Sequence, residues 1–383
     1  MRRGGLLAKF TLTPLRALLS LSLLAVLSAG LVLFVIFREQ INSGMLSFLG
    51  GGFRFGAARE PDALSISLDK DPRNQYGLCN GKLAVLSPER LVLYNSAGAE
   101  AYSASIGMDD PVLRTGGNKA MVFDRGGQHL RIYGENGLEY ALDEEAVLQA
   151  KLSEKDCWLA VTQESGYKGV VRVYNASNNE IFVWQSAQSG YITDADITPN
   201  GDKLAAAMVR QEREEVVARI VVYGTSKGEL QTDISIPDGI VLSVSFFTGG
   251  NLCVFTENDV RVYSPHGALI SSFGYANKTL LGAAVSAELC VFRTSKHSAG
   301  ISGELTAFAP NGSVRLSIDT EEDVDDLCVA GGYTAVLSYG TLSLYNSGGN
   351  LIYSQVDTEV RRVLVTQSGA LLLITQSIAY WLK

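Results

Sequence analysis

The sequence contains few of the residues that carry out enzymatic chemistry. It has only three histidines, and none has a second histidine or a carboxylate at the spacing of metal ligands. No H-E-x-x-H pattern occurs, and no G-x-S-x-G or phosphate-cradling glycine loop follows a strand and opens a helix. We therefore expect no catalytic residue, no metal site and no cofactor, and whether the protein is an enzyme stays open.

Basic charge is also scarce in most of the chain. The formal net charge is −8, but residues 1–60 hold seven of the 32 basic residues and only two of the 40 acidic ones. The remainder therefore has 25 basic and 38 acidic residues, a net charge of −13. Nucleic acids and anionic lipids are bound through basic patches. We expect no nucleic-acid partner.

One long hydrophobic run stands near the N-terminus. Residues 17–37 are 21 residues without a charge, enough to cross a bilayer core of about 30 Å as a helix. A cleaved signal peptide or a buried core helix is the alternative, but the apolar run continues past the small residues that a peptidase would need. Four basic residues and no acidic one precede it, which predicts a cytoplasmic N-terminus.

This reading divides the chain into four parts. Residues 1–16 form a cytoplasmic basic tail, residues 17–37 a single transmembrane helix, and residues 38–62 a glycine-rich tether. Residues 63–383 form a globular domain outside the cytoplasm. The predicted location is the cell membrane, with one span and an extracytoplasmic domain.

The globular part repeats one phrase, an apolar strand that ends in an aromatic residue and is followed by a glycine-containing turn. We call this position the aromatic slot. Its occupants follow one another at intervals of 39, 41, 49, 40, 45 and 37 residues. A period of 40 to 45 residues with four short strands per unit is typical of a β-propeller blade. The slot is occupied by Tyr94, Tyr133, Tyr174, Tyr223, Tyr263, Phe308 and Tyr345, and by Tyr380 in a last, incomplete unit.

The fold class is therefore all-β, a β-propeller with eight blades. In each blade we name the strands A to D from the centre outward. The last blade lacks its outer strand, and residues 63–68, which alternate polar and apolar, are expected to supply it and close the ring. Seven blades remain the alternative, if the C-terminal unit only caps a neighbour.

The turns at 197–205 and 309–313 resemble the S/T-P-D/N-G turns of YVTN-type and other WD-like bacterial propellers. With the predicted anchor, the chain resembles bacterial single-pass membrane-anchored β-propeller families of unknown function. That resemblance implies the fold and the membrane location, and it assigns no active-site residue.

The five cysteines and the slot residues have a simpler interpretation as core. Free cysteine behaves as a small buried apolar residue, and we expect all five to be buried. The pair Cys253 and Cys290 is the candidate for a disulfide between neighbouring blades. Large residues at equivalent points of radial sheets are expected to pack blades together.

Long B–C loops suggest where the protein binds a partner. Residues 163–169, 210–215 and 293–303 are longer than their counterparts in the other blades, and all lie on one face of the predicted ring. Insertions on one face of a repeat protein often mark its binding surface. The candidate binding residues are Tyr167, Lys168, Arg210, Glu212, Arg213, Lys296 and His297.

Three functions follow from these features. The first is a non-catalytic binding or scaffolding module for a protein or cell-envelope ligand. The second is a carbohydrate hydrolase or lyase that uses carboxylates of the central channel, with Asp194, Asp196 and Asp110 as candidates. The third is a structural subunit that assembles envelope machinery through its rim or its anchor.

Overall fold

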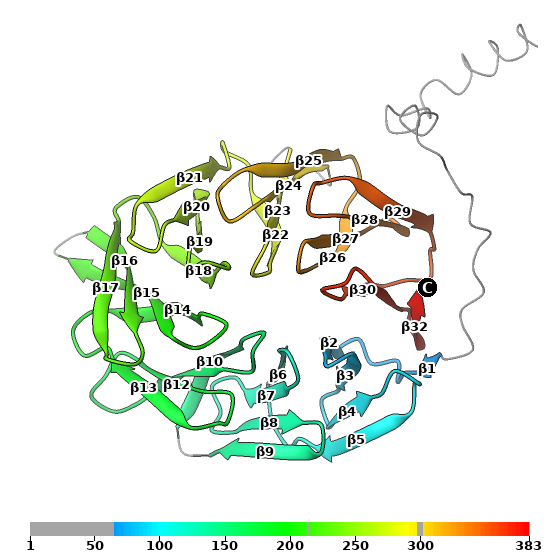
Figure 1. Ribbon diagram of the computed structural model, residues 1–383, viewed down its shortest axis with the longest axis horizontal. Helices are drawn as coiled ribbons and strands as arrows, with labels where there is room; N and C mark the ends of the chain where they lie inside the picture. Colours follow the sequence, from blue (N-terminus) through cyan, green and yellow to red (C-terminus); the bar gives the residue numbers. More distant parts are fainter. Residues whose placement is uncertain (1–64, 144, 213–214, 297–301, 383) are drawn as a thin grey trace, which may run out of the picture. The chain divides into compact units, whose positions relative to one another are not determined.

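The computed structural model describes residues 65–382, except 144, 213–214 and 297–301. In this part of the chain, 32 strands form eight four-stranded antiparallel sheets, which follow one another around a ring (Figure 1). The predicted all-β propeller and its eight blades are confirmed, and the seven-bladed alternative is wrong.

The first four blades take the strands in chain order from the centre outward. Blade 1 consists of β2 (Gln75–Cys79), β3 (Lys82–Leu86), β4 (Arg90–Tyr94) and β5 (Glu100–Ser105). Blade 2 consists of β6 (Pro111–Thr115), β7 (Ala120–Asp124), β8 (Leu130–Gly134) and β9 (Gly137–Leu142). Blade 3 consists of β10 (Ala146–Leu152), β11 (Trp158–Gln163), β12 (Val170–Tyr174) and β13 (Glu180–Gln185). Blade 4 consists of β14 (Tyr191–Ile197), β15 (Lys203–Glu212), β16 (Glu215–Gly224) and β17 (Glu229–Ile236).

The next three blades repeat the order, and the eighth combines both ends of the domain. Blade 5 consists of β18 (Val241–Phe246), β19 (Leu252–Thr256), β20 (Asp259–Tyr263) and β21 (Leu269–Gly274). Blade 6 consists of β22 (Leu280–Val285), β23 (Cys290–Ser295), β24 (Gly303–Phe308) and β25 (Val314–Thr320). Blade 7 consists of β26 (Val324–Ala330), β27 (Tyr333–Ser338), β28 (Thr341–Tyr345) and β29 (Leu351–Val356). Blade 8 consists of β30 (Arg362–Val365), β31 (Leu371–Ile374), β32 (Ile378–Leu382) and β1 (Ile66–Ser67).

The turn after the aromatic slot is built from local chemistry. In blade 1 the Asn95 side chain accepts hydrogen bonds from the backbone N–H groups of Ala97 and Ala99, at 3.0 Å each. Gly98 follows at φ 78°, a conformation that glycine adopts without steric cost. The C–D register then shifts by one residue at Tyr94, and the same shift recurs at the slot residue of blades 2 to 7. The turn therefore sets both the hairpin and the position of the slot.

The slot residues lie between blades, as predicted. Eight hydrophobic clusters occur in the described chain, and each combines residues of two adjacent blades. Each slot aromatic packs into the cluster that its blade shares with the preceding one. Tyr174, for example, stacks on the buried Trp158 with ring centroids 3.7 Å apart, and Tyr140 of blade 2 packs against both rings.

The ring is closed by β1, which pairs antiparallel with β32 through Ile66 opposite Ala379 and Ser67 opposite Ile378. Ile66 is 2% exposed and belongs to the cluster between blades 8 and 1. The expected closure by an N-terminal strand is thus confirmed. No described residue belongs to a helix that is long and apolar enough to cross a bilayer. The predicted tail (1–16), transmembrane helix (17–37) and tether (38–62) lie outside the described residues.

We expect Ile66→Ala to lower the free energy of unfolding of the full chain by about 2 to 4 kcal/mol, because it leaves a cavity at the closing seam. Denaturant unfolding followed by tryptophan fluorescence measures this. The neighbouring Ser67 is exposed, so Ser67→Ala serves as the control and should change stability by less than about 0.5 kcal/mol. Equal effects of the two substitutions would contradict a closing role for β1.

Candidate functional site

In an up-and-down propeller the B–C turns and the connections between blades emerge on the same side of the ring. We call this side the B–C face. The hairpin of blade 4 stands out on it, because β15 and β16 have ten residues each. Residues 210–212 were expected in a loop, but they continue β15 as strand, and Glu215 already begins β16.

The end of this hairpin extends beyond both neighbouring strands. On the inner side β14 begins opposite Val209, and on the outer side β17 ends opposite Ala218. Three further residue pairs, from Arg210–Val217 to Glu212–Glu215, continue without a third strand in the described chain. At about 3.3 Å per residue the ribbon protrudes by about 10 Å. Charged residues at such open edges limit unspecific strand pairing.

A recess of about 880 Å³ lies against the outer side of this ribbon. The Arg219 guanidinium and the Asp233 carboxylate line it and pair with each other. Arg210 pairs with Glu212, with 2.5 Å between Nε and Oε1. Val216 is the exposed apolar residue of the wall. The surface therefore offers charges of both signs around the exposed side chain of Val216.

Blade 3 adds an aromatic and a basic residue beside the base of the hairpin. The Lys168 ammonium lies 5.3 Å from the centre of the Tyr191 ring, a cation–π contact. Tyr191 starts β14 and is 62% exposed, and Tyr167 is exposed beside Lys168. Gly190 has φ 133°, and a Cβ there would come within 2.6 Å of the Val209 carbonyl oxygen. This close approach holds the start of blade 4 against the hairpin.

The structure thus brings four of the predicted binding residues to neighbouring blades: Tyr167 and Lys168 on blade 3, Arg210 and Glu212 on blade 4. Lys296 lies on blade 6, where it pairs with Asp319 at 3.0 Å. Arg213 and His297 fall outside the described residues. Tyr191 was not predicted as part of the site. A tyrosine at the start of an A strand was its only signal in the sequence.

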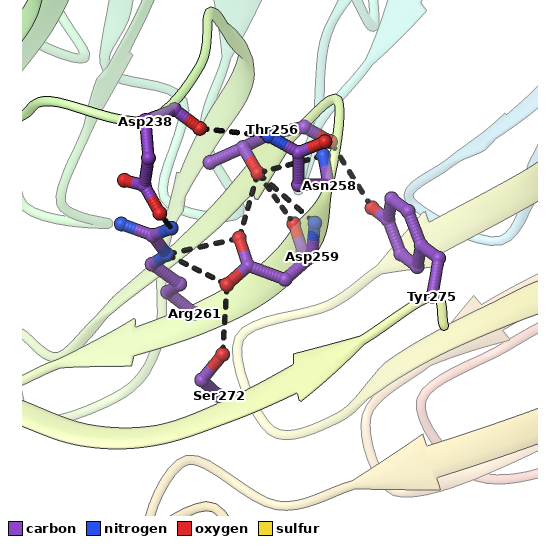
Figure 2. A network of polar contacts seen from close by, with 7 residues as sticks. All are labelled: Asp238, Thr256, Asn258, Asp259, Arg261, Ser272 and Tyr275. Atoms are coloured by element: carbon purple, nitrogen blue, oxygen red, sulfur yellow. Dashed lines mark hydrogen bonds and ion pairs between the residues drawn. The ribbon is translucent and has the colours of Figure 1, made fainter. Parts of the chain in front are cut away.

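The B–C turn of blade 5 is fixed by a partly buried polar network, shown in Figure 2. Arg261 donates from Nε to both carboxylate oxygens of Asp259 (2.9 and 2.8 Å) and from Nη2 to Asp238 (2.8 Å). The Thr256 hydroxyl donates to Asp259 at 2.6 Å. The Tyr275 hydroxyl donates to the carbonyl oxygen of Thr256. Through Asp238, the network joins the segment that connects blades 4 and 5 to the B–C turn of blade 5.

The charges of this network stabilise one another. Burial opposes the charge of Arg261, but hydrogen bonds with Asp238 and Asp259 outweigh burial and raise its pKa. The hydrogen bond from Arg261 lowers the pKa of Asp238. Burial raises the pKa of the Tyr275 hydroxyl, so this group remains a donor. The network has no unpaired charge and has a structural role.

The channel carboxylates proposed for catalysis are used to join blades. Asp194 accepts hydrogen bonds from the backbone N–H of Val244 (2.7 Å) and from the Lys151 ammonium (2.9 Å). Asp196 accepts one from the N–H of Phe246 (2.7 Å). Burial raises the pKa of Asp196, and Lys151 partly opposes this. Both carboxylates therefore accept hydrogen bonds from backbone N–H groups at the inner edge of β18.

Asp110 is not part of this group, because it pairs with Arg125 at 3.8 Å. The segment 224–228 matches G-x-S-x-G, but it turns between the antiparallel strands β16 and β17 and opens no helix. No group of histidine, cysteine or carboxylate side chains in the described chain could hold a metal ion. These observations give no support to the hydrolase hypothesis.

The opposite end of the channel contains a smaller recess of about 260 Å³. Arg114 lines it and donates to the carbonyl oxygen of Leu113. Burial and the nearby Arg125 lower the pKa of Arg114. Glu154 lines the same recess. Burial raises the pKa of its carboxyl group, and repulsion from the Glu288 carboxylate raises it further. The sequence analysis missed both residues, because neither belongs to a sequence motif that could be recognised without the fold.

All five cysteines are free thiols, and four of them are buried. Cys253 and Cys290 lie in one cluster between blades 5 and 6, but both are free thiols, so the candidate disulfide is absent from the structure. Burial raises the pKa of the Cys290 thiol, and its contact with Cys253 raises it further. Burial also raises the pKa of the Cys79 thiol to about 11.

Comparison with known proteins supports the fold. A family model described as "Family of unknown function (DUF5711)" matches residues 63–379. No curated protein matches the chain. Several solved propellers are similar in structure. The C-terminal WD40 domain of Sif2 has a TM-score of 0.54 at 12% identity, covering 82% of this chain and 98% of its own.

Two further structures are similar to the same extent. BamB from Moraxella catarrhalis has a TM-score of 0.51 at 14% identity, covering 83% of this chain and 96% of its own. Sqt1 from Chaetomium thermophilum, solved bound to the N-terminus of the ribosomal protein L10, has a TM-score of 0.56 at 12% identity. That match covers 85% of this chain and 100% of Sqt1. Identities this low establish the fold alone.

We expect Asp259→Asn to lower the free energy of unfolding by about 3 kcal/mol, because it leaves the buried Arg261 guanidinium with half of its partners. Chemical denaturation measures the loss. The exposed pair Arg73–Asp71 provides the control, since solvent screens its charges and Arg73→Ala should leave the free energy of unfolding nearly unchanged. A loss for Asp259→Asn as small as that of the control would show that the network does not hold the turn.

Proposed function

Starting from the family of unknown function DUF5711, to which the chain belongs, we propose that the protein is a membrane-anchored, extracytoplasmic β-propeller. It binds a protein or cell-envelope ligand without catalysis, and its binding surface is the B–C face. Residues 17–37 anchor it, with the N-terminus in the cytoplasm.

One observation carries the binding part of this proposal, the ribbon of blade 4. It protrudes by about 10 Å, it has two open edges, and a recess of about 880 Å³ lies beside it. No packing requirement of the ring explains this length, because the other blades close with B and C strands of four to six residues. Tyr191, at the start of blade 4, and Tyr167 and Lys168, on blade 3, extend the same surface.

The anchor is supported by the sequence. The uncharged run of 21 residues, with basic residues before it, is typical of a single span with a cytoplasmic N-terminus. The Sqt1 structure offers a parallel for the binding role, because a propeller of this general fold is there bound to the N-terminus of another protein. A protein segment is therefore a reasonable ligand for the B–C face.

Replacing residues 210–217 with Asn-Gly should remove partner binding and leave the ring folded. The replacement joins Val209 to its cross-strand partner Ala218 through the two-residue turn that hairpins favour. The measurement is capture of partners from detergent-solubilised native membranes, quantified by mass spectrometry. We expect the partner captured by the original chain to fall by at least about tenfold, equivalent to 1.4 kcal/mol.

The matched control changes the opposite face of the same blade. Lys227→Ala combined with Glu229→Ala alters the C–D turn of blade 4 and should leave capture unchanged. If the shortened hairpin captures as much partner as the control, the B–C face is not the binding surface.

The membrane topology can be tested by cysteine labelling, because the native thiols should react slowly. Maleimides react with thiolates, and a pKa of about 11 keeps Cys79 protonated at neutral pH. Ser177 is exposed in the C–D turn of blade 3. We expect Ser177→Cys to be labelled by a membrane-impermeant maleimide in intact cells.

Thr13→Cys, in the predicted cytoplasmic tail, is the matched position on the other side of the span. It should be labelled only after the cells are permeabilised. Labelling of Thr13→Cys in intact cells, with Ser177→Cys protected, would reverse the proposed orientation. Protection of both would place the propeller in the cytoplasm.

A further inference from the structure

The innermost strands of five consecutive blades share an irregularity that the other three lack. In blades 3 to 7 the A strand has one extra residue relative to its B strand, a β-bulge. The A–B ladders of blades 1, 2 and 8 run without a shift. The extra residues are Leu148, Thr193, Leu242, Leu281 and Asp325, which we call the bulge arc.

All five bulges occupy the same place in the blade. Each directly follows the first or second paired residue of its A strand, the end that adjoins the connection from the preceding blade. This end lies at the B–C face, and the A strand lines the channel. The bulge arc therefore surrounds part of the channel opening on the face that carries the long ribbon. Bulges are frequent beside binding sites, where they redirect a side chain.

Three of the five residues are exposed leucines. Leu148, Leu242 and Leu281 are 41%, 51% and 45% exposed, and none belongs to a cluster between blades. A single exposed leucine needs no explanation. Three at equivalent positions of blades 3, 5 and 6 form an apolar lining at one opening, which is a feature of interaction sites.

The end of the arc at blade 7 is acidic. Asp325 takes the position of the leucines there, and Glu321 and Glu322 precede it in the connection from blade 6. These three carboxylates have no ion-pair partner among the described residues. Their neighbours do, since Asp323 pairs with Arg293 and Asp326 with Arg362. Arg361 of blade 8 also has no carboxylate partner among the described residues. Its single positive charge is outnumbered by the three unpaired carboxylates, so the net charge stays negative.

We propose that the bulge arc binds a segment of the partner that carries aliphatic side chains followed by lysine or arginine. The inference rests on the proposed binding function and names the chemistry of the ligand. The aliphatic groups contact Leu148, Leu242 and Leu281, and the basic group lies against Asp325, Glu321 and Glu322. A ligand that reaches from blade 3 to blade 7 must be extended, which favours a peptide over a compact small molecule.

The experiment is a selection of random displayed peptides on the full chain in detergent micelles. We expect the enriched sequences to combine aliphatic residues with lysine or arginine. A representative peptide is then synthesised, and its Kd is measured by fluorescence anisotropy at low and at physiological salt. Enrichment of acidic or purely polar sequences, or no enrichment at all, would overturn the inference.

Two variants test the two halves of the arc separately. Leu148→Ser, Leu242→Ser and Leu281→Ser together should weaken binding of the peptide by at least about tenfold. Glu321→Gln, Glu322→Gln and Asp325→Asn together should weaken it by a similar factor and reduce its salt dependence. The control is Leu351→Ser, because Leu351 is 50% exposed on the outer strand of blade 7. The inference fails if either triple variant binds the peptide as tightly as this control.

The outcomes separate this inference from the proposed function. If the hairpin replacement abolishes capture of the native partner while no aliphatic and basic peptide is selected, the binding face stands and the ligand chemistry is wrong. If a peptide is selected that the triple variants lose, but the hairpin replacement still captures the native partner, the arc stands and the ribbon is not required.

Discussion

The packing of each blade against the one before it is the contact on which the rest of the ring depends. A single four-stranded sheet of this size has one aromatic slot, and the partners of that aromatic are supplied by the preceding blade, as when Phe308 stacks on Phe273 with 4.5 Å between centroids. Part of every cluster is thus contributed by a neighbouring blade. No blade buries its apolar face alone, so closure of the ring by Ile66 stabilises all eight.

The same dependence explains the polar residues of the channel. The A strand is the inner edge of its sheet, and its free backbone N–H groups need acceptors. Gln75 supplies one for Leu113 at 2.9 Å, Asp194 one for Val244 and Asp326 one for Val363 at 2.8 Å. Carboxylates that looked available for chemistry therefore connect blades. The blade 4 ribbon and the bulge arc, in contrast, are not needed to join blades. They are therefore the features of the ring that we associate with function.

Much of the fold could be predicted because its determinants are local. Asn95 and Gly98 specify a turn within five residues, and the repeat of that turn gives the blade count. Alternation in residues 63–68 sufficed to identify the closing strand. The conformation of the candidate site was harder to predict from the sequence. Arg210 and Glu212 were placed in a loop because charged residues favour solvent, although a ribbon with two open edges exposes them equally well.

Other features of the site depend on residues far apart in the sequence. The bulge at Leu242 depends on how β18 meets β19, and no residue type marks it. The acceptor role of Asp194 depends on Val244, 50 residues later and in another sheet. Such pairings follow from the ring and not from either segment. The choice of the B–C face therefore stays a prediction from the sequence, while the partners of individual side chains required the structure.

The pairing of Ile66 with Ala379 joins residues that are 313 positions apart. At ribosomal rates of about 5 to 20 residues per second, roughly 15 to 60 s pass between synthesis of the two. During that interval β1 has no partner strand, and seven finished blades form an open arc with two bare flanks. Among the described strands, the first to be made is the last to be paired. Until β32 has been made, the apolar side of Ile66 has no neighbour to cover it, and exposed strand edges of this kind favour aggregation.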